Sequence, residues 1–276
     1  MQAPASGFGM AGPHSRMRPF SERFAEIPTR LVQKVNGVET EEGFVHIGRC
    51  IVDEIEKAAG SLSETRDILD FGCGLGRVTA QLLDRAPLAD FVGFDIDPLM
   101  LMWAGVLLED PRVRLASTTL DLPDASMDLV IAISVFTHLD ATTDYWLAEI
   151  HRVLRPSGRA FVTYHDEGLF REMAAAGKIP VVAADATLDG RFIVGSDSAE
   201  GGAEMGTFYT TGHWERLIGR HFVIEKTVPR GLFGHQSYSL IRKKDVAIDR
   251  TALFRDYVLS VEKQLFDLRR AHTVFY

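Results

Sequence analysis

Three glycines alternate with other residues directly after a short apolar segment and directly before a helical pattern. They are Gly72, Gly74 and Gly76. A turn of this kind lets the backbone approach a ligand closely. A dinucleotide-binding turn would place its third glycine where this chain has Arg77. Asp70 adds an acid just before the glycines, which suits a cationic ligand. The spacing therefore disfavours a dinucleotide.

Two histidines follow predicted strands at the edge where open α/β sheets bind ligands. His138 comes after the fourth predicted strand, and His165 comes after the fifth. Histidine is the usual proton acceptor near neutral pH, so both are candidate catalytic bases, with His138 the first choice. Alternatively, His138 caps a turn or packs beside a ligand, and His235 is simply a turn residue. No metal is expected, because the histidines lack a compact spacing such as His-x-x-x-His.

The stretch from Asp70 to Gly76 resembles the first motif of class I S-adenosylmethionine-dependent methyltransferases. In that family the acid and the glycine turn hold the methionine part of the cofactor. A second acid at the end of the next strand binds both ribose hydroxyls, and Asp95 resembles it. One carboxylate has two acceptor oxygens for two adjacent hydroxyl donors. The resemblance implies that Ile96 lies against the adenine.

The resemblance continues in family order over residues 66–165, and a weaker similarity extends to Lys243. The fourth-strand block includes the family's Leu-Pro pair at Leu122 and opens its strand at Asp128. Where many members carry an acid that contacts the adenine amine, this chain has Thr118. The resemblance implies these cofactor-binding residues: Asp70, Gly72, Cys73, Gly74, Gly76, Asp95, Ile96, Thr119, Leu120 and Ser134.

The implied activity is methyl transfer from S-adenosylmethionine to a small-molecule or saccharide acceptor, with a hydroxyl expected. The segment 31–37 is similar to a lead-in of some bacterial small-molecule or saccharide-associated methyltransferases. In some of these enzymes a histidine placed like His138 is the base. The Asn/Asp-Pro-Pro-Tyr tetrapeptide of enzymes that methylate DNA bases and amides is absent, because residues 134–137 read Ser-Val-Phe-Thr. A nucleic-acid acceptor is therefore not expected.

Two other functions stay open. The chain could bind S-adenosylmethionine as a sensor or scaffold without transferring a methyl group. It could also be a nicotinamide-dependent oxidoreductase, which Asp70 and Arg77 disfavour.

The elements that must position these residues alternate along the chain. Short apolar segments predict strands, and segments with apolar residues at steps of three and four predict helices. Strands that are apolar on both faces are typical of parallel sheets covered by helices. The pattern predicts an α/β, Rossmann-like open twisted sheet, mostly parallel with an antiparallel closing strand and helices on both faces. Predicted strands cover 67–71, 91–95, 112–118, 127–133, 159–164, 222–228 and 237–241, and predicted helices cover 42–59, 99–108, 142–155 and 249–270.

Three regions are expected. Residues 1–60 form a flexible leader and a helical lead-in, residues 61–245 the methyltransferase domain, and residues 246–276 a C-terminal helix. Within the domain, residues 167–210 are an insertion that forms a substrate loop, with a hairpin around Asp189-Gly190 and a mobile loop over 181–210. Thr211 caps the next helix. The apolar stripe of the final helix indicates core packing or, as the alternative, a homodimer contact.

Composition sets the broader limits. The 276 residues are 46% hydrophobic and 25% charged, which is ordinary for a globular chain. The net charge is −8, so the surplus of basic residues typical of a nucleic-acid binder is missing. Cys50 and Cys73 are the only cysteines and cannot build a disulfide framework, which favours a reducing, cytoplasmic location. No apolar stretch approaches the roughly 20 residues needed to span a membrane.

Overall fold

The computed structural model describes residues 18–36, 39–117, 119–179, 190–194 and 206–273. Several predictions fall outside the described residues. They concern the leader before residue 18, Thr118, Asp189 and much of the 181–210 loop.

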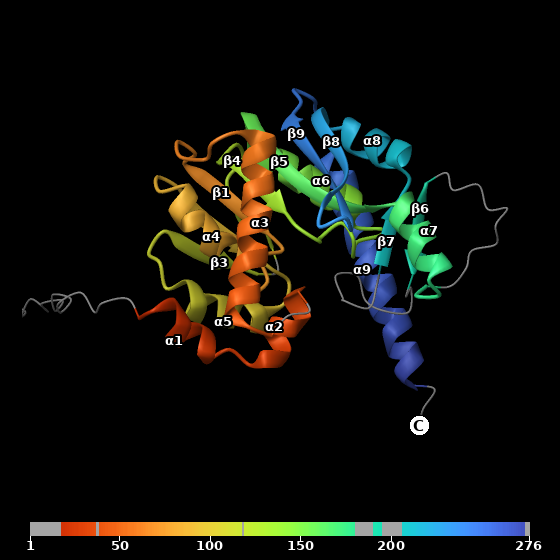
Figure 1. Cartoon of the computed structure of the whole chain (residues 1–276). Coiled ribbons are helices and arrows are strands. Elements are labelled where there is room, and N and C mark those ends of the chain that lie inside the picture. Colours follow the sequence, from red (N-terminus) through yellow and green to blue (C-terminus); the bar gives the residue numbers. More distant parts are fainter. Residues whose placement is uncertain (1–17, 37–38, 118, 180–189, 195–205, 274–276) are drawn as a thin grey trace, which may run out of the picture.

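A mixed sheet forms the central layer (Figure 1). Its strands are β1 (Asp67–Phe71), β2 (Asp90–Phe94), β3 (Val113–Ala116), β4 (Met127–Ala132), β5 (Leu154–Asp166), β6 (Arg191–Val194), β7 (Gly206–Tyr209), β8 (Phe222–Leu232) and β9 (Gln236–Lys243). Strands β3-β2-β1-β4-β5 are parallel neighbours in that order. Strand β9 closes the sheet antiparallel to β5, and β8 pairs antiparallel with β9. The mostly parallel sheet with an antiparallel closing strand is confirmed.

Helices cover both faces of this sheet, as expected. They are α1 (Phe20–Ala25), α2 (Thr29–Asn36), α3 (Glu41–Ala59), α4 (Arg77–Arg85), α5 (Pro98–Leu108), α6 (Thr143–Val153), α7 (Glu167–Ala175), α8 (Thr211–Gly219) and α9 (Arg250–Thr273). Successive strand residues point to opposite faces. Ile68 therefore packs in the cluster formed with α3 and α4, while Leu69 packs in the cluster formed with α6 and α8. Burial on both faces explains why β1 is apolar without alternation.

The N-terminal lead-in packs against the ligand-binding end of the sheet. Phe24 of α1 and Leu31 of α2 lie in one apolar cluster with Leu75, which belongs to the glycine-rich turn. Phe24 also meets Phe44 of α3 edge to face, with ring centroids 5.4 Å apart. This packing places α2 beside the turn that follows β1, so the lead-in forms part of the site.

The end of the sixth helix differs from the expectation. The helix ends at Val153, and β5 begins at once with Leu154, so the predicted helix end at residue 155 is wrong. Pro156 and Gly158 are residue types that often follow a helix. Both residues instead lie near the start of β5, where its pairing with β4 shifts register. A Cβ at Gly158 would lie 3.0 Å from the Met127 carbonyl oxygen. The glycine and the proline are therefore features of a strand irregularity, which commonly holds these residue types.

The inserted region contains a hairpin that adds to the sheet. Strands β6 and β7 pair antiparallel, and β7 runs parallel to the end of β5. The described hairpin thus lies after Gly190, further along the chain than the turn predicted at Asp189-Gly190. The cap of α8 is also one residue earlier than predicted, because Thr210 accepts a hydrogen bond from the His213 amide at 3.2 Å. Threonine at this position satisfies a free helix amide.

The C-terminal helix α9 packs on α6 through aromatic rings. Tyr257 stacks on Tyr145 with centroids 4.2 Å apart, and it meets Trp146 edge to face. Phe254 and Leu265 are about half exposed. The stripe on α9 is therefore partly core packing, and a homodimer through its remaining apolar residues stays a prediction.

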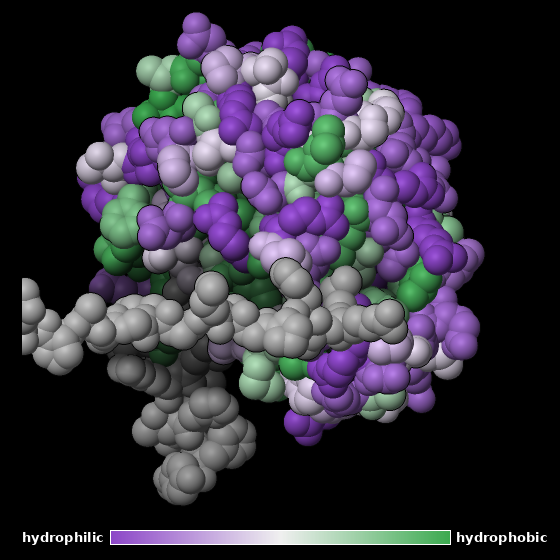
Figure 2. Space-filling view, turned by 90° about the vertical axis from the view of Figure 1, so that its left-hand side faces the viewer, coloured by the Kyte–Doolittle hydropathy of each residue, from purple (hydrophilic) through white to green (hydrophobic). Residues whose placement is uncertain are grey.

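The surface in Figure 2 is mostly hydrophilic, with scattered apolar residues. Single exposed apolar residues are ordinary on a folded chain. Over the described part of the chain, no helix combines the length and the apolar character needed to cross a membrane. The cytoplasmic location stays a prediction.

Candidate functional site

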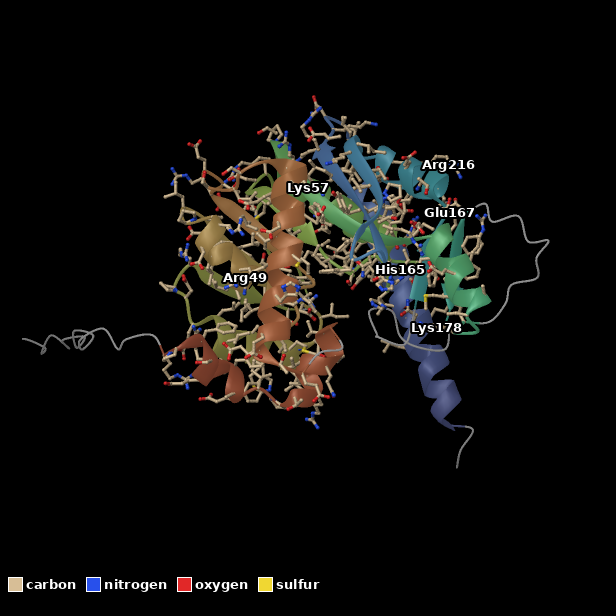
Figure 3. The ribbon with its side chains drawn as sticks, in the orientation of Figure 1. Arg49, Lys57, His165, Glu167, Lys178 and Arg216 are labelled. Carbon is tan, nitrogen blue, oxygen red and sulfur yellow. The ribbon has the colours of Figure 1, made fainter. Side chains whose placement is uncertain are left out.

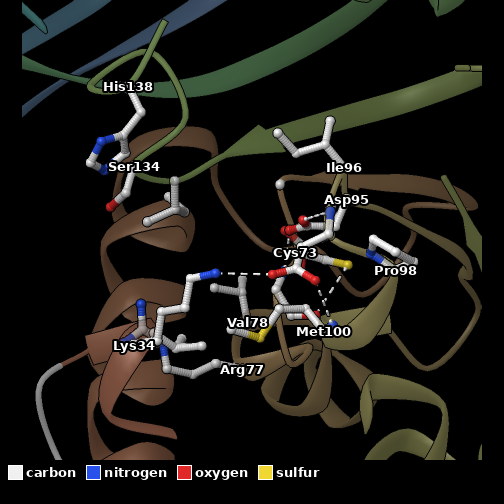
Figure 4. Close-up of a pocket in the computed structure, with 16 residues that line it drawn as sticks. Lys34, Cys73, Arg77, Val78, Asp95, Ile96, Pro98, Met100, Ser134 and His138 are labelled. Atoms are coloured by element: carbon white, nitrogen blue, oxygen red, sulfur yellow. Dashed lines mark hydrogen bonds and ion pairs between the residues drawn. The ribbon is translucent and has the colours of Figure 1, made fainter. Parts of the chain in front are cut away.

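A cavity of about 500 Å³ lies at the C-terminal ends of β1, β2 and β4, and Figure 4 shows it in close-up. This is the edge at which open α/β sheets bind ligands. Its lining contains seven of the predicted cofactor residues, together with a side chain from the lead-in helix and a candidate base. These residues are Asp70, Gly72, Cys73, Gly74, Asp95, Ile96, Ser134, Lys34 and His138. The structure therefore brings most of the predicted site together.

The glycine-rich turn has backbone angles that need glycine. The φ angles of Gly72, Gly74 and Gly76 are +80°, +54° and +77°. A Cβ at Gly72 would lie 2.3 Å from Cγ2 of Val135, closer than the packing allows. Gly76 is the N-cap of helix α4 and packs against Leu108, so it shapes the turn without lining the cavity. The alternating glycines are thus explained by backbone geometry and close packing.

Asp95 organises the turn through both carboxylate oxygens. Oδ2 accepts a hydrogen bond from the Gly74 amide, and Oδ1 accepts one from the Asp97 amide, each at 2.8 Å. Burial raises the pKa of Asp95, while these two backbone hydrogen bonds act to lower it. The next residue, Ile96, is 52% exposed and presents an apolar side chain at the cavity. A carboxylate beside an apolar surface suits a ligand that carries two adjacent hydroxyls next to a flat ring.

Asp70 is almost fully buried at the floor of the cavity. It is 2% exposed, and its Oδ2 accepts a hydrogen bond from the Thr79 hydroxyl at 2.6 Å. Burial raises the pKa of Asp70 to about 6 from its ordinary value of 3.8. The folded chain therefore binds this proton more tightly than the unfolded chain. Accordingly, the contribution of Asp70 to the free energy of unfolding falls as the pH rises from about 4 to about 6.

We expect this carboxyl to make cofactor binding depend on pH. A bound cation favours the carboxylate, so protonation of Asp70 below about pH 6 opposes binding. The affinity for S-adenosylmethionine should then fall by up to about tenfold per pH unit below this value. Calorimetric titration between pH 5 and pH 8 on the wild type and on Asp70→Asn measures the effect. A wild-type curve as flat as that of the variant would contradict it.

Two basic residues that were not predicted as site residues line the cavity. Lys34 of α2 donates to Asp97 Oδ2 at 3.0 Å, across the cavity mouth. Arg77, the first residue of α4, is 9% exposed, and burial lowers its pKa to about 10. Figure 4 shows both side chains below Ser134 and His138. The sequence analysis used Arg77 only to disfavour a dinucleotide-binding turn. It assigned no role to Lys34, which lies in the lead-in.

His138 lines the cavity together with Ser134 (Figure 4). It also lines a smaller adjoining cavity of about 130 Å³ that reaches Trp146. Ser134 has a φ of +60°, and its amide donates to the Thr163 hydroxyl at 2.8 Å. Non-glycine residues at positive φ are uncommon and cluster at functional sites. Of the two candidate bases, His138 is the one that faces the cofactor cavity.

His165 lies outside this cavity, where β5 meets the β6–β7 hairpin (Figure 3). Its ring packs against Phe208 with centroids 5.0 Å apart. Burial, together with the neighbouring His138 and His235, lowers the pKa of His165 to about 4. An imidazole with this pKa is neutral at pH 7 and a poor proton acceptor. Its catalytic role stays a prediction.

The two residues expected near the adenine lie apart from the cavity lining. Thr119 is exposed, and its amide donates to the Ser117 carbonyl at 2.8 Å. Leu120 is 6% exposed, and its carbonyl accepts a hydrogen bond from Arg152 at 2.9 Å. Neither residue lines either of the two cavities described above. Their contact with adenine also stays a prediction.

A further cavity of about 310 Å³ adjoins the first. The two share four lining residues, which are Val35, Arg77, Ile133 and Ser134. The other residues that line this cavity of about 310 Å³, called the second cavity below, come from α3 and the β8–β9 turn. They are apolar except for His235 and Gln236. Gln236 donates from Nε2 to the Ser134 hydroxyl at 2.7 Å. The hydrogen bond between Gln236 and Ser134 was not expected from the sequence, because only the folded sheet brings β9 beside the end of β4.

Comparisons with known proteins agree with the fold. Residues 69–162 match the family model described as a methyltransferase domain. Over 72 residues the chain is 40% identical to a trans-aconitate 2-methyltransferase from Enterobacter, covering 26% of this chain and 29% of that one. Over 112 residues it is 34% identical to a malonyl-[acyl-carrier protein] O-methyltransferase from Hahella chejuensis, covering 38% and 40%. The matches thus span less than half the length of either relative.

A solved structure shows the same fold over a longer stretch. An S-adenosylmethionine-dependent methyltransferase from Mesorhizobium loti aligns with a TM-score of 0.54 at 18% identity. The alignment covers 70% of this chain and 98% of that one. The expected Rossmann-like methyltransferase fold is confirmed.

Proposed function

We propose, from the premise that this chain carries a class I S-adenosylmethionine-dependent methyltransferase domain, that it transfers a methyl group to an oxygen of a small molecule. The observation that carries the proposal is that the first and second cavities adjoin and share part of their walls. The first holds the glycine turn and Asp95, and the second joins it along Ile133 and Ser134. His138 lies at the same end of the first cavity as Ser134 (Figure 4). A donor and an acceptor placed in these cavities would meet beside a candidate base.

S-adenosylmethionine is the cofactor, and the side chains of the first cavity fit its chemistry. We assign the ribose hydroxyls to Asp95, which lines the cavity. The half-exposed Ile96 offers an apolar surface for the adenine ring. Asp70 supplies a carboxyl to the cationic methionine part, on the floor formed with the glycine turn. Cys73 is a small buried side chain whose thiol pKa is raised by burial, so it acts as a packing residue.

The second cavity is our assignment for the acceptor. When bound, S-adenosylmethionine supplies an electrophilic methyl group, which the acceptor oxygen takes as the carbon–sulfur bond breaks and S-adenosylhomocysteine is left. His138 accepts the hydroxyl proton at a ring nitrogen and passes it to water. The wall residues hold the oxygen in line with the methyl, which supplies much of the rate by positioning. The similarity to a malonyl-[acyl-carrier protein] O-methyltransferase supports oxygen as the acceptor atom. Saccharides stay among the acceptor classes to be tested.

The experiment that tests the function has two stages. Purified chain is first titrated calorimetrically with S-adenosylmethionine, S-adenosylhomocysteine and NAD. We expect micromolar binding of the two sulfur compounds and no signal from NAD, since Arg77 replaces the third glycine of a dinucleotide turn. Formation of S-adenosylhomocysteine is then measured with a panel of hydroxylated small molecules, sugars included.

The outcomes separate the functions left open by the sequence. Binding of the sulfur compounds with turnover on a panel member supports methyl transfer. Binding without turnover across the panel would favour a sensor or scaffold that holds the cofactor. An NAD signal with no response to the sulfur compounds would overturn the proposal and favour an oxidoreductase.

A further inference from the structure

Arg77 is a buried cation whose side chain makes no hydrogen bond and no ion pair among the described residues. Its side chain is 9% exposed and lines both cavities. Its Nε is fully shielded from solvent and has no hydrogen-bond partner there, and no carboxylate of the described chain lies within ion-pair distance of its guanidinium. A buried polar group without a partner costs about 1 to 3 kcal/mol, and more when it is charged. Asp70 attracts the guanidinium electrostatically but forms no ion pair with it. A ligand anion would therefore supply the direct partner that Arg77 lacks.

The neighbouring helix is built to hold Arg77 in this place. Helix α3 crosses α4 at Gly48, where a Cβ would lie 2.7 Å from the Arg77 carbonyl oxygen. The same Cβ would lie 3.2 Å from the Arg77 Cγ. Any larger residue at position 48 would therefore displace the backbone or the side-chain stem of Arg77. The close approach of the helices fixes the guanidinium at the boundary between the cavities.

The other charged groups of the first cavity are already engaged. Lys34 is paired with Asp97 at 3.0 Å, and Asp70 accepts a hydrogen bond from Thr79. Asp95 accepts two backbone hydrogen bonds at the turn. The cofactor of this site carries one negative group, the carboxylate of its methionine part. Arginine binds carboxylates through a planar fork of donors, which makes it the residue suited to such a group.

We propose that Arg77 binds the carboxylate of S-adenosylmethionine and so selects cofactors that retain their amino-acid end. The inference rests on the proposed function, because it requires S-adenosylmethionine in the first cavity. Arg77 thereby adds a basic contact to a site whose predicted members were acids, glycines and small or apolar residues. Its position at the boundary places the cofactor's tail against the wall of the acceptor cavity.

The test compares two ligands that differ only in this carboxylate. S-adenosylmethionine and decarboxylated S-adenosylmethionine are titrated calorimetrically into the wild type, Arg77→Gln and Arg77→Lys. Arg85→Gln is the matched control, because it removes a positive charge from the exposed end of the same helix, where Arg85 pairs with Asp53 and Glu56. Thermal unfolding of each variant is measured in parallel.

We expect the wild type and Arg85→Gln to prefer the intact cofactor by about 10- to 100-fold. Arg77→Gln should bind both ligands with nearly equal affinity, and Arg77→Lys should keep part of the preference, since lysine retains the charge without the fork. A wild type with equal affinity for both ligands would overturn the inference, even if Arg77→Gln fails to fold.

Two further outcomes separate this inference from the proposed function. If Arg77→Gln keeps the full preference, the inference is overturned while the cofactor assignment stands. A raised KM for the acceptor in that variant would assign the cation to the acceptor. If neither ligand binds the wild type, both the cofactor assignment and this inference are overturned.

Discussion

His138→Ala lowers kcat by about 10²- to 10⁴-fold in the assay that follows S-adenosylhomocysteine formation, the range that a positioned general base contributes. The reason is that His138 is the imidazole in the wall of the cofactor cavity, next to the strained Ser134. Cofactor affinity should change little, because the imidazole is assigned to the acceptor proton and not to the cofactor. The measurement combines steady-state kinetics with calorimetry of S-adenosylhomocysteine.

Two further variants sharpen this result. His138→Gln keeps a polar side chain of similar reach but cannot accept a proton at neutral pH, so it should lose nearly as much as the alanine variant. His46→Ala is the matched control, because His46 is exposed on α3 and lines neither main cavity. Normal turnover by His138→Ala on an acceptor that the wild type methylates would dismiss His138 as the base.

Asp95→Ala should weaken S-adenosylhomocysteine binding by about 10- to 100-fold, the equivalent of about 1 to 3 kcal/mol for unpaired hydrogen-bonding groups. Part of the loss comes from the ribose hydroxyls. The rest comes from the turn, because the amides of Gly74 and Asp97 lose the carboxylate that they bond at 2.8 Å. Calorimetry gives the affinity, and thermal unfolding without ligand gives the contribution of the turn.

A control variant on the same strand distinguishes a loss at the binding site from a general effect on the strand. Asp90→Ala removes an exposed acid from the opposite end of β2, far along the strand from the cavity. This variant should bind S-adenosylhomocysteine as the wild type does. If Asp95→Ala also kept full affinity, the ribose assignment would be lost, although a fall in thermal stability would still support the role of Asp95 in the turn.

Local patterns predicted the elements that carry the site. The strand over 67–71 has the observed bounds, since an apolar run followed at once by glycines has few other structures open to it. Asp95 follows β2 and Ser134 follows β4, as the alternation of strands and helices required. Parallel strands then bring these residues to one edge of the sheet without any long-range information.

The parts that could not be predicted depend on contacts between distant segments. Gln236 reaches Ser134 across 102 positions, and Lys34 reaches Asp97 across 63. The start of β5 was missed because Leu154 pairs with Met127, while the nearby proline and glycine locally favour a break. Arg77 gave no signal of its own, because the packing of α3 on α4 determines its burial. Such features require the fold before they can be assigned.

The two cavities are lined largely by different parts of the chain. This difference affects how the protein could diversify in evolution. The floor of the cofactor cavity comes from within residues 69–162, the stretch shared with its relatives. Most of the adjoining cavity comes from outside it, from Ile47 and Ile51 and from the turn at 232–236. Under the proposed assignment of the adjoining cavity to the acceptor, mutations in those outer segments would change acceptor preference while leaving the cofactor site intact. A chimera that exchanges only the outer walls is the corresponding engineering route to a new acceptor.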